Sequence, residues 1–581
     1  MPENSISPNS SLLRSLLYLA LGILCVVGFY DVGAGYGDYA IAYGRGDVYI
    51  HSNELIMYVW YLTFGIPAAF FLSLALLHTQ WPERLERWGS FLIEHKYWLL
   101  GALAFLFVAV LLFWWGVLMA GARIADDEST YLFIAQTLNM GRVTNPLPTD
   151  PEFYRNKFVL MKSSGWFGKY PIGFPALLAV GYRLNLTFLI NPLLTCASLA
   201  LTYAIGTRLF SRTVAGLGVV FMLFSPHFVF TGATLLSQPA STAMMLLGFY
   251  IMLRVYDEPK WTWALAGGVA WGFGVLIRPF PGILFLAVAA LHYLWVMHQR
   301  GWKGQVWSRL KPLVLAAIPV AIFGVLFLSA NHIQSGSATT SGYHQVHRSF
   351  GIVRAAKGVM TSSIGGALFR ENFWLFGWPL SFLFVFFCRR GQHLALFWGL
   401  ILADYSYRII VPKTVVATTG PIYVTEAVPL LCLATAAGIV ALGSWCVERG
   451  WEEGKRWLLS LSVASTLVAL CTFYPIHIQS IQESCEIWNR PFQMLQDANA
   501  KKKVLVFANY MVPHTFDDSW AYHPPNPSPT LDDDILFVRL PKPKSTRERM
   551  KKFWKKNHPK RQAWLFFYVK RKPYLIKIGD P

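Results

Sequence analysis

The chain has 581 residues, of which 54% are hydrophobic and only 14% are charged, and its formal net charge is +20. This composition excludes an ordinary soluble protein, because a soluble chain of this size needs more charged surface. The apolar residues also form uncharged runs, such as 98–120, 312–330 and 427–445, each long enough to cross a hydrocarbon core of roughly 30 Å. We therefore expect an α-helical polytopic membrane protein.

Thirteen apolar runs are predicted to span the membrane as helices, and the first is read as a retained span because it lacks an obvious cleavage site. They cover residues 12–29, 54–78, 97–120, 187–207, 212–230, 236–254, 262–278, 281–298, 312–330, 372–388, 393–410, 421–444 and 457–475. The segment 170–182 is also apolar, but it is short and rich in Pro and Gly, which favours an interfacial or re-entrant piece. The seven cysteines show no CxxC spacing and predict no disulfide framework.

Basic residues in the short loops predict the orientation. With the N-terminus in the cytoplasm, most Lys and Arg residues of the short loops face the cytoplasm, which is the positive-inside pattern. This topology places the loops 121–186 and 331–371 and the tail after residue 476 outside the cytoplasm. We expect a multi-pass protein of a bacterial inner (plasma) membrane with an extracytoplasmic C-terminal domain.

Three divisions of the chain are expected. Residues 1–96 hold N-terminal transmembrane helices, 97–475 form a transmembrane catalytic region, and 484–581 form a basic C-terminal α/β domain. The last of these contains 19 Lys and Arg against 9 Asp and Glu. Its predicted elements are strands at 504–508, 535–540, 563–569 and 574–578, a helix at 545–557 and a Pro-rich loop at 523–529.

The predicted helix at 545–557 is strongly basic, with aromatic residues interleaved. Such a run can indicate nucleic-acid binding, but the predicted extracytoplasmic location argues against that partner. Contact with anionic lipid or an anionic glycan fits better, and a plain solvated face is the common alternative.

Three acidic residues in a row, Asp126, Asp127 and Glu128, follow directly on the third predicted span. A single carboxylate would cap the helix that is expected to start here and would match its dipole. Three carboxylates at a membrane boundary cost desolvation and mutual repulsion, and a raised pKa there suits a general base. We therefore predict a catalytic cluster, with helix capping as the alternative.

Basic residues are predicted on the same side of the membrane. Arg278 lies among apolar residues at the outer end of a span, where an Arg is costly unless it faces a cavity or a partner. Lys169 lies in the first large loop, and contact with lipid headgroups explains it equally well. Arg348 and Arg354 in the second large loop are further candidates for substrate contact. The histidines of that loop lack a neighbouring carboxylate and predict no metal site.

The combination of these segments resembles the GT-C glycosyltransferases, in particular the branch with protein O-mannosyltransferases and aminoarabinose transferases. The resemblance spans roughly residues 97–475 and rests on residues 127–131, 168–175, 206–210, 276–279 and 420–429. Two departures concern phosphate binding, since Tyr170 separates Lys169 from Pro171 and Ile422 stands where an Arg is common.

The resemblance implies an inverting-type transfer of a sugar from a polyprenyl-phosphate carrier to an extracytoplasmic acceptor, which could be a glycan, a lipid or a protein. Asp127 would be the base, with Asp126 as a competitor because the doublet leaves the register open. Lys169 and Arg278 would bind the phosphate. The sequence shows no required cofactor, and it leaves a divalent metal open.

Tyr423 and Glu426 match the last of these segments, which implies contact with the sugar or phosphate. A hydrogen-bonded pair that closes the helix end is the alternative for them. Two other functions stay open for the whole chain. An O-antigen ligase or polymerase would use a lipid-diphosphate donor and rely on Arg348 and Arg354. A polytopic transporter or flippase should show broken helices and internal repeats.

Overall fold

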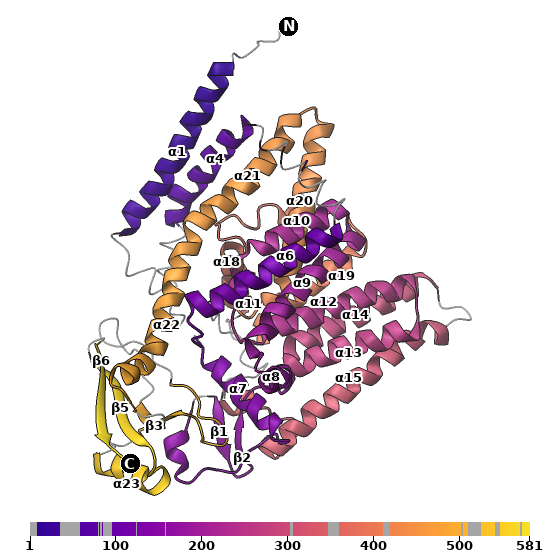
Figure 1. The fold of residues 1–581 in the computed structure, drawn as a ribbon. Coiled ribbons are helices and arrows are strands. Elements are labelled where there is room, and N and C mark those ends of the chain that lie inside the picture. Colours follow the sequence, from indigo (N-terminus) through magenta and orange to yellow (C-terminus); the bar gives the residue numbers. More distant parts are fainter. Residues whose placement is uncertain are drawn as a thin grey trace, which may run out of the picture.

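The structure is a computed structural model of a mainly helical protein with a small sheet near its C-terminus (Figure 1). It describes residues 8–34, 59–79, 81, 84, 87, 96–123, 125–156, 158–301, 306–346, 360–410, 419–500, 503–508, 524–540, 547–569 and 572–581.

The helices of the bundle follow the predicted apolar runs, because a backbone in a hydrocarbon environment must satisfy its own hydrogen bonds. The N-terminal ones are α1 (Pro8–Ala34), η1 (Tyr61–Gly65), α4 (Ile66–Leu77), α6 (Lys96–Phe113) and η2 (Trp114–Leu118). The central ones are α9 (Thr187–Leu209), α10 (Arg212–Leu223), α11 (Pro226–Gly232), α12 (Gln238–Asp257), α13 (Trp261–Ile277), α14 (Pro279–Gln299) and α15 (Val306–Ser335). The later ones are α16 (Gly342–Val346), α18 (Met360–Trp374), η4 (Val385–Phe387), α19 (Leu394–Ile410), η5 (Thr425–Ala427), α20 (Val428–Glu448), α21 (Glu452–Cys471) and α22 (Phe473–Asp497).

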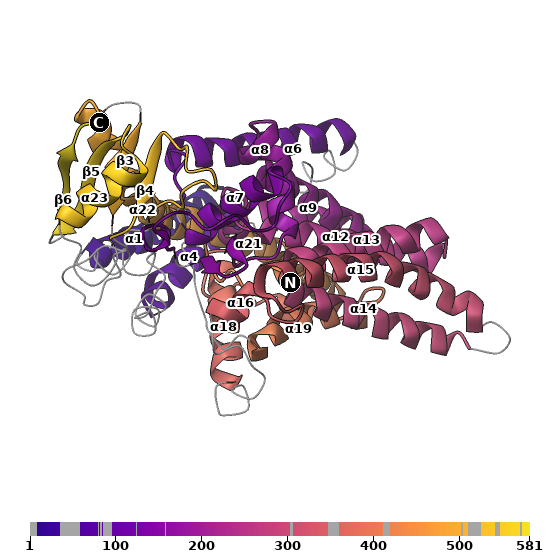
Figure 2. The ribbon, with the colours of Figure 1, turned by 90° about the horizontal axis from the view of Figure 1, so that it is seen from below.

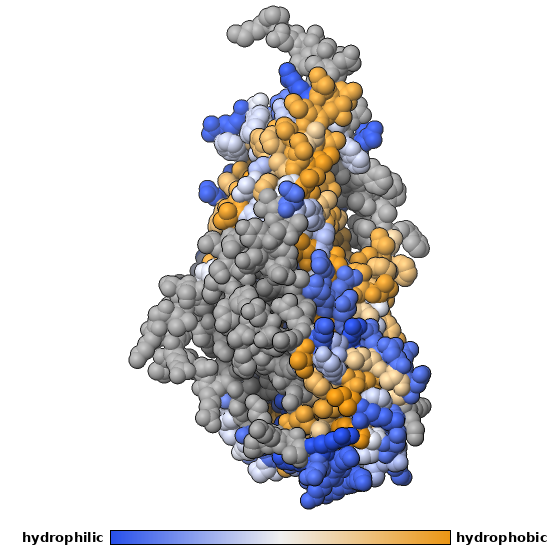
Figure 3. All heavy atoms as spheres, turned by 90° about the vertical axis from the view of Figure 1, so that its left-hand side faces the viewer, coloured by the Kyte–Doolittle hydropathy of each residue, from blue (hydrophilic) through white to orange (hydrophobic). Residues whose placement is uncertain are grey.

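Seven of the described helices are long and apolar enough to cross a membrane, and an eighth is added if the bent pair α10–α11 is one span. Four shorter apolar helices lie at Tyr61–Leu77, Ala104–Leu118, Trp261–Ile277 and Leu394–Ser406. The protein is therefore a multi-span membrane protein, while the count of thirteen spans and the orientation of the termini stay predictions. On the face seen in Figure 3, apolar side chains predominate in the upper part and hydrophilic ones gather at the lower end.

Burial separates central from peripheral helices. In α12, 78% of the most apolar 18-residue window is buried, whereas in α15 only 11% is buried, so α15 turns most of its apolar surface toward lipid. α13 packs closely between them. A Cβ at Gly268 of α13 would lie 2.2 Å from the carbonyl oxygen of Ala316 in α15, so only glycine permits this approach of the two backbones.

Two predicted spans differ from the structure. The run 212–230 is not one straight helix: α10 and α11 meet at a bend of 63°, where Pro226 opens α11. Proline cannot donate a backbone hydrogen bond and therefore interrupts the helix. The bend brings His227, at the start of α11, into the interior of the bundle, where it is fully buried.

The prediction of a helical span at 372–388 is wrong. α18 ends at Trp374, a series of turns follows, and η4 is a single 3₁₀ turn. Asn372 stabilises the turns, since its Nδ2 donates to the Pro379 carbonyl and its Oδ1 accepts from the Phe382 amide at 2.8 Å. The apolar composition concealed this break, because hydropathy reports how apolar a segment is and not whether its backbone is helical.

The first large loop folds into its own small unit. It contains α7 (Asp126–Asn139), η3 (Pro151–Tyr154), the antiparallel hairpin β1 (Val159–Lys162) and β2 (Gly165–Gly168), and α8 (Gly173–Arg183). α8 is the short apolar piece that the sequence suggested, and it packs on α7. The hairpin was not predicted, because four-residue strands carry little periodic signal.

The C-terminal sheet confirms the predicted strands and helix. It consists of β3 (Val504–Ala508), β4 (Ile535–Val538), β5 (Gln562–Val569) and β6 (Lys572–Gly579), with α23 (Arg547–Asn557) between β4 and β5. The strand order is β4-β3-β5-β6, with β3 parallel to β4 and β5, and β6 antiparallel to β5. α22 continues past the bundle and leads to the sheet, which lies at the same end of the molecule as the first loop (Figures 1 and 2).

The first loop and the C-terminal sheet share one hydrophobic core. Phe153 of η3 stacks on Phe553 of α23 with ring centroids 3.8 Å apart, and both side chains are buried. The same core includes Trp166 of β2 and Phe507 of β3. The two segments are about 400 residues apart in the sequence and nevertheless pack as one body.

Candidate active site

The acidic cluster opens α7, as the sequence predicted, but its three members differ in environment. Glu128 is buried: its Oε1 accepts from the Ala125 amide at 3.1 Å, and its Oε2 accepts from the Leu235 amide at 2.8 Å. It therefore caps the helix and ties it to the segment before α12. Asp126 and Asp127 are only half-buried.

Asp127 is held by an aromatic group of the first loop. The Tyr170 hydroxyl donates to its Oδ1, and the Tyr170 ring lies 4.5 Å from the ring of Tyr131, one turn further along α7. Burial, and then the Asp127 charge, raise the pKa of Tyr131, while Arg278 and a hydrogen bond to Ser237 act in the opposite direction. Asp127 and Arg278 therefore both lie within electrostatic range of the Tyr131 hydroxyl.

Lys169 is buried in a cage of aromatic rings. Its Nζ lies 3.2 Å from the ring centroid of Phe158, 4.7 Å from that of Tyr170 and 5.6 Å from that of Tyr343. The faces of these rings attract the ammonium group without cancelling its charge. Gly342 permits the cage to close, because a Cβ there would lie 2.4 Å from the Lys169 carbonyl oxygen. The explanation by lipid headgroups does not fit a side chain that is 4% exposed.

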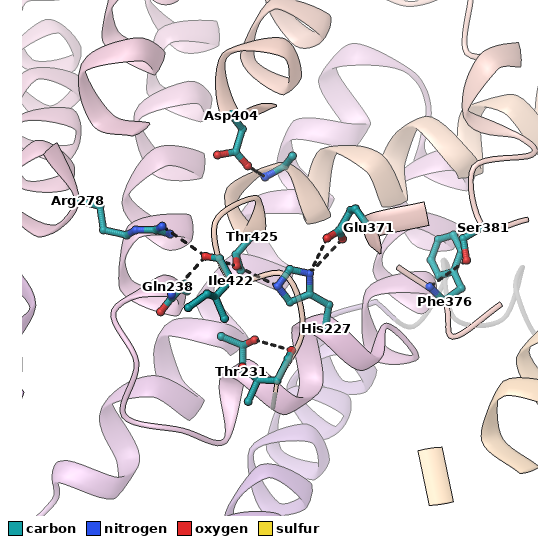
Figure 4. Close-up of polar contacts among 12 residues, drawn as sticks. His227, Thr231, Gln238, Arg278, Glu371, Phe376, Ser381, Asp404, Ile422 and Thr425 are labelled. Atoms are coloured by element: carbon teal, nitrogen blue, oxygen red, sulfur yellow. Dashed lines mark hydrogen bonds and ion pairs between the residues drawn. The ribbon is translucent and has the colours of Figure 1, made fainter. Parts of the chain in front are cut away.

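Arg278 is the residue that joins α13 to α14, and its side chain is buried in the bundle. Its Nη1 donates to Oε1 of Glu426 at 2.7 Å, and its Nη2 donates to the Ile422 carbonyl at 3.4 Å. Nε2 of Gln238 donates to the same carbonyl at 3.3 Å. Figure 4 shows the two side chains reaching Ile422 together. The partner that Arg278 needed, at its buried position, is thus a carboxylate from the segment 420–429.

Tyr423 lies beside this group and is half-buried. The segment changes direction at Gly420, whose φ of +113° is strained for any other residue. A Cβ at this position would also approach the ring of Trp374 to 3.0 Å.

Two buried acids near this segment were not identified from the sequence. Glu371 bonds to His227 Nδ1 at 3.0 Å, and His227 Nε2 lies 3.0 Å from the Thr425 hydroxyl (Figure 4). Oδ2 of Asp404 accepts from the Ala427 amide at 2.8 Å. Asp404 lies inside a predicted span, so a charge within an apolar run was the signal that could have found it. These residues hold the backbone that carries Glu426.

Of the nine predicted site residues, the structure brings six together, and a seventh, Glu128, supports them as a helix cap. The six are Asp126, Asp127, Lys169, Arg278, Tyr423 and Glu426. Arg348 and Arg354 lie outside the described residues. Among the residues that the structure describes, no three His, Cys, Asp or Glu side chains gather as a metal ion would require.

Sequence and structure comparisons agree on the type of protein. Residues 170–325 match the profile of a family described as dolichyl-phosphate-mannose-protein mannosyltransferase. No curated protein sequence matches the chain. The fold is similar to ArnT from Cupriavidus metallidurans, bound to undecaprenyl phosphate and in the apo state, with TM-scores of 0.52 and 0.51. Both matches have 13% identity and cover 82% of this chain and 98% of that chain.

A weaker similarity, with a TM-score of 0.41, links the chain to the arabinosyltransferase EmbB from Mycobacterium smegmatis, at 13% identity over 74% of this chain and 45% of that one. The match of residues 170–325 to a mannosyltransferase profile and the ArnT-like fold both agree with the predicted resemblance to the GT-C glycosyltransferases.

Proposed function

We propose that this protein is a membrane glycosyltransferase that moves a sugar from a polyprenyl-phosphate carrier to an acceptor outside the cytoplasm, with Asp127 as general base. The observation that carries the proposal is the grouping around α7. Asp127 is bonded to Tyr170, the Lys169 ammonium lies over the Tyr170 ring, and Arg278 acts on the neighbouring Tyr131. A carboxylate and two cations thus border one site.

This grouping suits an inverting displacement. The acceptor hydroxyl would attack the anomeric carbon while the bond from that carbon to the phosphate oxygen breaks. Asp127 would take the acceptor proton, and the lipid phosphate would leave as an anion. Proton removal and charge stabilisation at the leaving group are the two contributions that such a reaction needs from the protein. Lys169 and Arg278 are the residues we assign to the phosphate.

Buried oxygen atoms beside Arg278 suit the sugar. Within the described part of the chain, Oε2 of Glu426 and Oε1 of Gln238 have no hydrogen-bond partner, although both are buried. An unsatisfied buried acceptor is costly, and hydroxyl groups of a sugar are donors that would satisfy it. We therefore assign Glu426 and Gln238, with Tyr423 beside them, to sugar recognition.

The carrier and the location follow from the same proposal. The ArnT structure of similar fold is bound to undecaprenyl phosphate, which supports a polyprenyl phosphate as carrier here. We place the first loop and the C-terminal domain outside the cytoplasm and the N-terminus inside. The acceptor is then a glycan, lipid or protein of the cell envelope, and the membrane is the bacterial inner membrane.

The test is a comparison of two neighbouring substitutions in the full-length protein. Asp127→Asn should lower transfer at least 100-fold, which is the lower range for loss of a general base. Asp126→Asn is the matched control and should stay within about threefold of wild type, since its carboxylate takes no part in the proposed step. The reverse result assigns the base to Asp126, and full activity in both variants would overturn the assignment.

The donor can be identified independently. A strain that lacks the protein should accumulate the unused lipid-linked sugar, and mass spectrometry of its lipid extract gives both the sugar and the carrier. A lipid diphosphate instead of a monophosphate in that extract would contradict the proposed carrier.

A further inference from the structure

A Pro-rich loop of the C-terminal domain reaches the helix that carries the candidate base. Nδ2 of Asn526 donates to Oγ1 of Thr130 at 3.1 Å, although 396 residues separate the two. The Thr130 hydroxyl in turn donates to the carbonyl of Asp126 at 2.9 Å. Thr130 is 1% exposed, so this contact is made in the protein interior. The loop therefore bonds to the first turn of α7, beside Asp127.

Asn526 is itself fixed by two further residues. Nδ2 of Asn156, in the first loop, donates to Oδ1 of Asn526. Nη2 of Arg539, which follows β4, donates to Oδ1 of Asn156 at 2.9 Å. The Arg539 backbone amide also donates to the Phe153 carbonyl at 2.7 Å. Asn526 thus bonds to two residues of the first loop, Thr130 and Asn156, and Asn156 in turn accepts from Arg539 of the C-terminal domain.

The four hydrogen bonds that connect Arg539 to Asp126 all run in the same direction. Arg539 donates to Asn156, Asn156 to Asn526, Asn526 to Thr130, and Thr130 to the carbonyl of Asp126. Hydrogen bonds that are aligned in this way polarise one another, and the guanidinium charge at the start strengthens the effect. This series of hydrogen bonds is called the Arg539–Thr130 relay.

We propose that Asn526 is a positioning residue of the transferase site, and that the C-terminal domain acts through the Arg539–Thr130 relay to fix the first turn of α7. The inference rests on the proposed role of Asp127. A displacement of a catalytic group by about 1 Å can cost on the order of 100-fold in rate, so a bond to this turn has a large effect on turnover. The relay consists of contacts within the protein and includes none of the groups assigned to the sugar or the phosphate, so we expect the effect to fall on kcat.

General docking of the domain is the competing explanation, and the interface offers a control for it. Nδ2 of Asn557 donates to Asp150 at 2.8 Å, across the same interface but away from α7. Asn557→Ala removes a contact between the two segments and leaves the relay intact. Asn526→Asp keeps the shape of the side chain and its acceptor for Asn156, but it cannot donate to Thr130.

The experiment uses the full-length protein in nanodiscs, with synthetic undecaprenyl-phosphate-linked hexoses and pentoses as donor probes. Asn526→Asp and Thr130→Val should each lower kcat between about tenfold and 100-fold, with the Kd for undecaprenyl phosphate within twofold of wild type. Thr130→Ser, which restores the hydroxyl, and Asn557→Ala should both stay near wild type. Wild-type kcat in Asn526→Asp, or an equal loss in Asn557→Ala, would overturn the proposal.

Hydrogen exchange gives a readout that does not depend on the reaction. The amides of residues 126–131 should exchange at least tenfold faster in Asn526→Asp than in wild type and should be unchanged in Asn557→Ala. If wild type transfers none of the probe sugars, the proposed function fails while the exchange result still decides the relay. Unchanged exchange in Asn526→Asp would overturn the relay even if transfer is observed.

Discussion

At the scale of single residues, sequence position alone could not separate the three acids of the cluster. Glu128 bonds to two backbone amides, whereas Asp127 accepts from the Tyr170 hydroxyl. Tyr170 was recognised from the sequence only as a departure from the family pattern. In the structure this residue makes two contacts: its hydroxyl donates to Asp127, and its ring covers the Lys169 ammonium group.

Removing that contact should slow the reaction. A hydrogen bond to a charged group contributes about 1.5–3 kcal/mol, so Tyr170→Phe is expected to lower kcat between roughly tenfold and 100-fold. Steady-state kinetics of the variant provide the measurement. Tyr182→Phe is the control, because Tyr182 is exposed in the same loop and its hydroxyl accepts a hydrogen bond from Gln136, near the C-terminal end of α7. Equal rates in Tyr170→Phe and wild type would show that the contact has no part in turnover.

The Arg278–Glu426 pair should dominate local stability. Breaking a buried ion pair by removing one partner costs about 3–5 kcal/mol, because the other charge stays buried without compensation. Glu426→Ala should therefore lower the Tm in detergent clearly. The double variant Arg278→Met, Glu426→Ala should be more stable than Glu426→Ala alone, since it no longer buries a guanidinium group that has lost its Glu426 carboxylate. A double variant that is less stable than both single variants would contradict this.

At the scale of elements, periodicity and length predicted most helices and the strands of the C-terminal domain. The predictions failed at 212–230, where Pro226 interrupts an apolar run, and at 372–388, where α18 ends at Trp374 and turns follow. Hydropathy does not distinguish burial in lipid from burial in protein, so it cannot detect such breaks. The site itself combines residues from five separate segments. The predicted topology placed the predicted ones on one side of the membrane and the family resemblance joined them, whereas His227, Glu371 and Asp404 were outside that resemblance.

The break after α18 provides a test at this scale. Asn372 joins both ends of the turns, and its loss leaves the Phe382 amide without this acceptor. Asn372→Ala is expected to lower the free energy of unfolding by about 1–3 kcal/mol, the range for an unsatisfied buried group. Asn372→Asp retains the acceptor and should cost less. Chemical unfolding followed by tryptophan fluorescence measures both variants, and equal costs would argue against the role of Oδ1.

At the scale of the whole molecule, the first loop and the C-terminal sheet form one body whose interface contains a titratable group. Nε2 of His558 lies 2.6 Å from the Tyr154 hydroxyl. Burial, and then the charge of Arg561, lower the pKa of His558 to about 4. Asp150 also faces this interface, and a hydrogen bond from Asn557 lowers its pKa below the ordinary value for a carboxyl group.

These shifts predict weaker docking in mild acid. His558 stays neutral in the folded state down to about pH 4, whereas in the unfolded chain it takes up a proton near pH 6.5. Its contribution is therefore complete above pH 6.5 and is lost as the pH falls toward 4. Hydrogen exchange in η3 and β5 should rise between pH 7 and 4.5, after correction for intrinsic rates. His558→Gln should remove most of that dependence, and an unchanged profile in the variant would assign it to other groups.

Because Thr130 and Asn526 are far apart in the sequence, their contact can form only late in synthesis of the protein. At about 5–20 residues per second, the ribosome needs roughly 20–80 s to make the 396 residues between them. Throughout this interval α23 does not yet exist to cover Phe153, and α7 has no hydrogen bond from Asn526. The newly made protein therefore passes through a stage in which all the proposed catalytic side chains exist but α7 still lacks its bond to Asn526. A premature stop before residue 526 would hold the protein permanently at that stage.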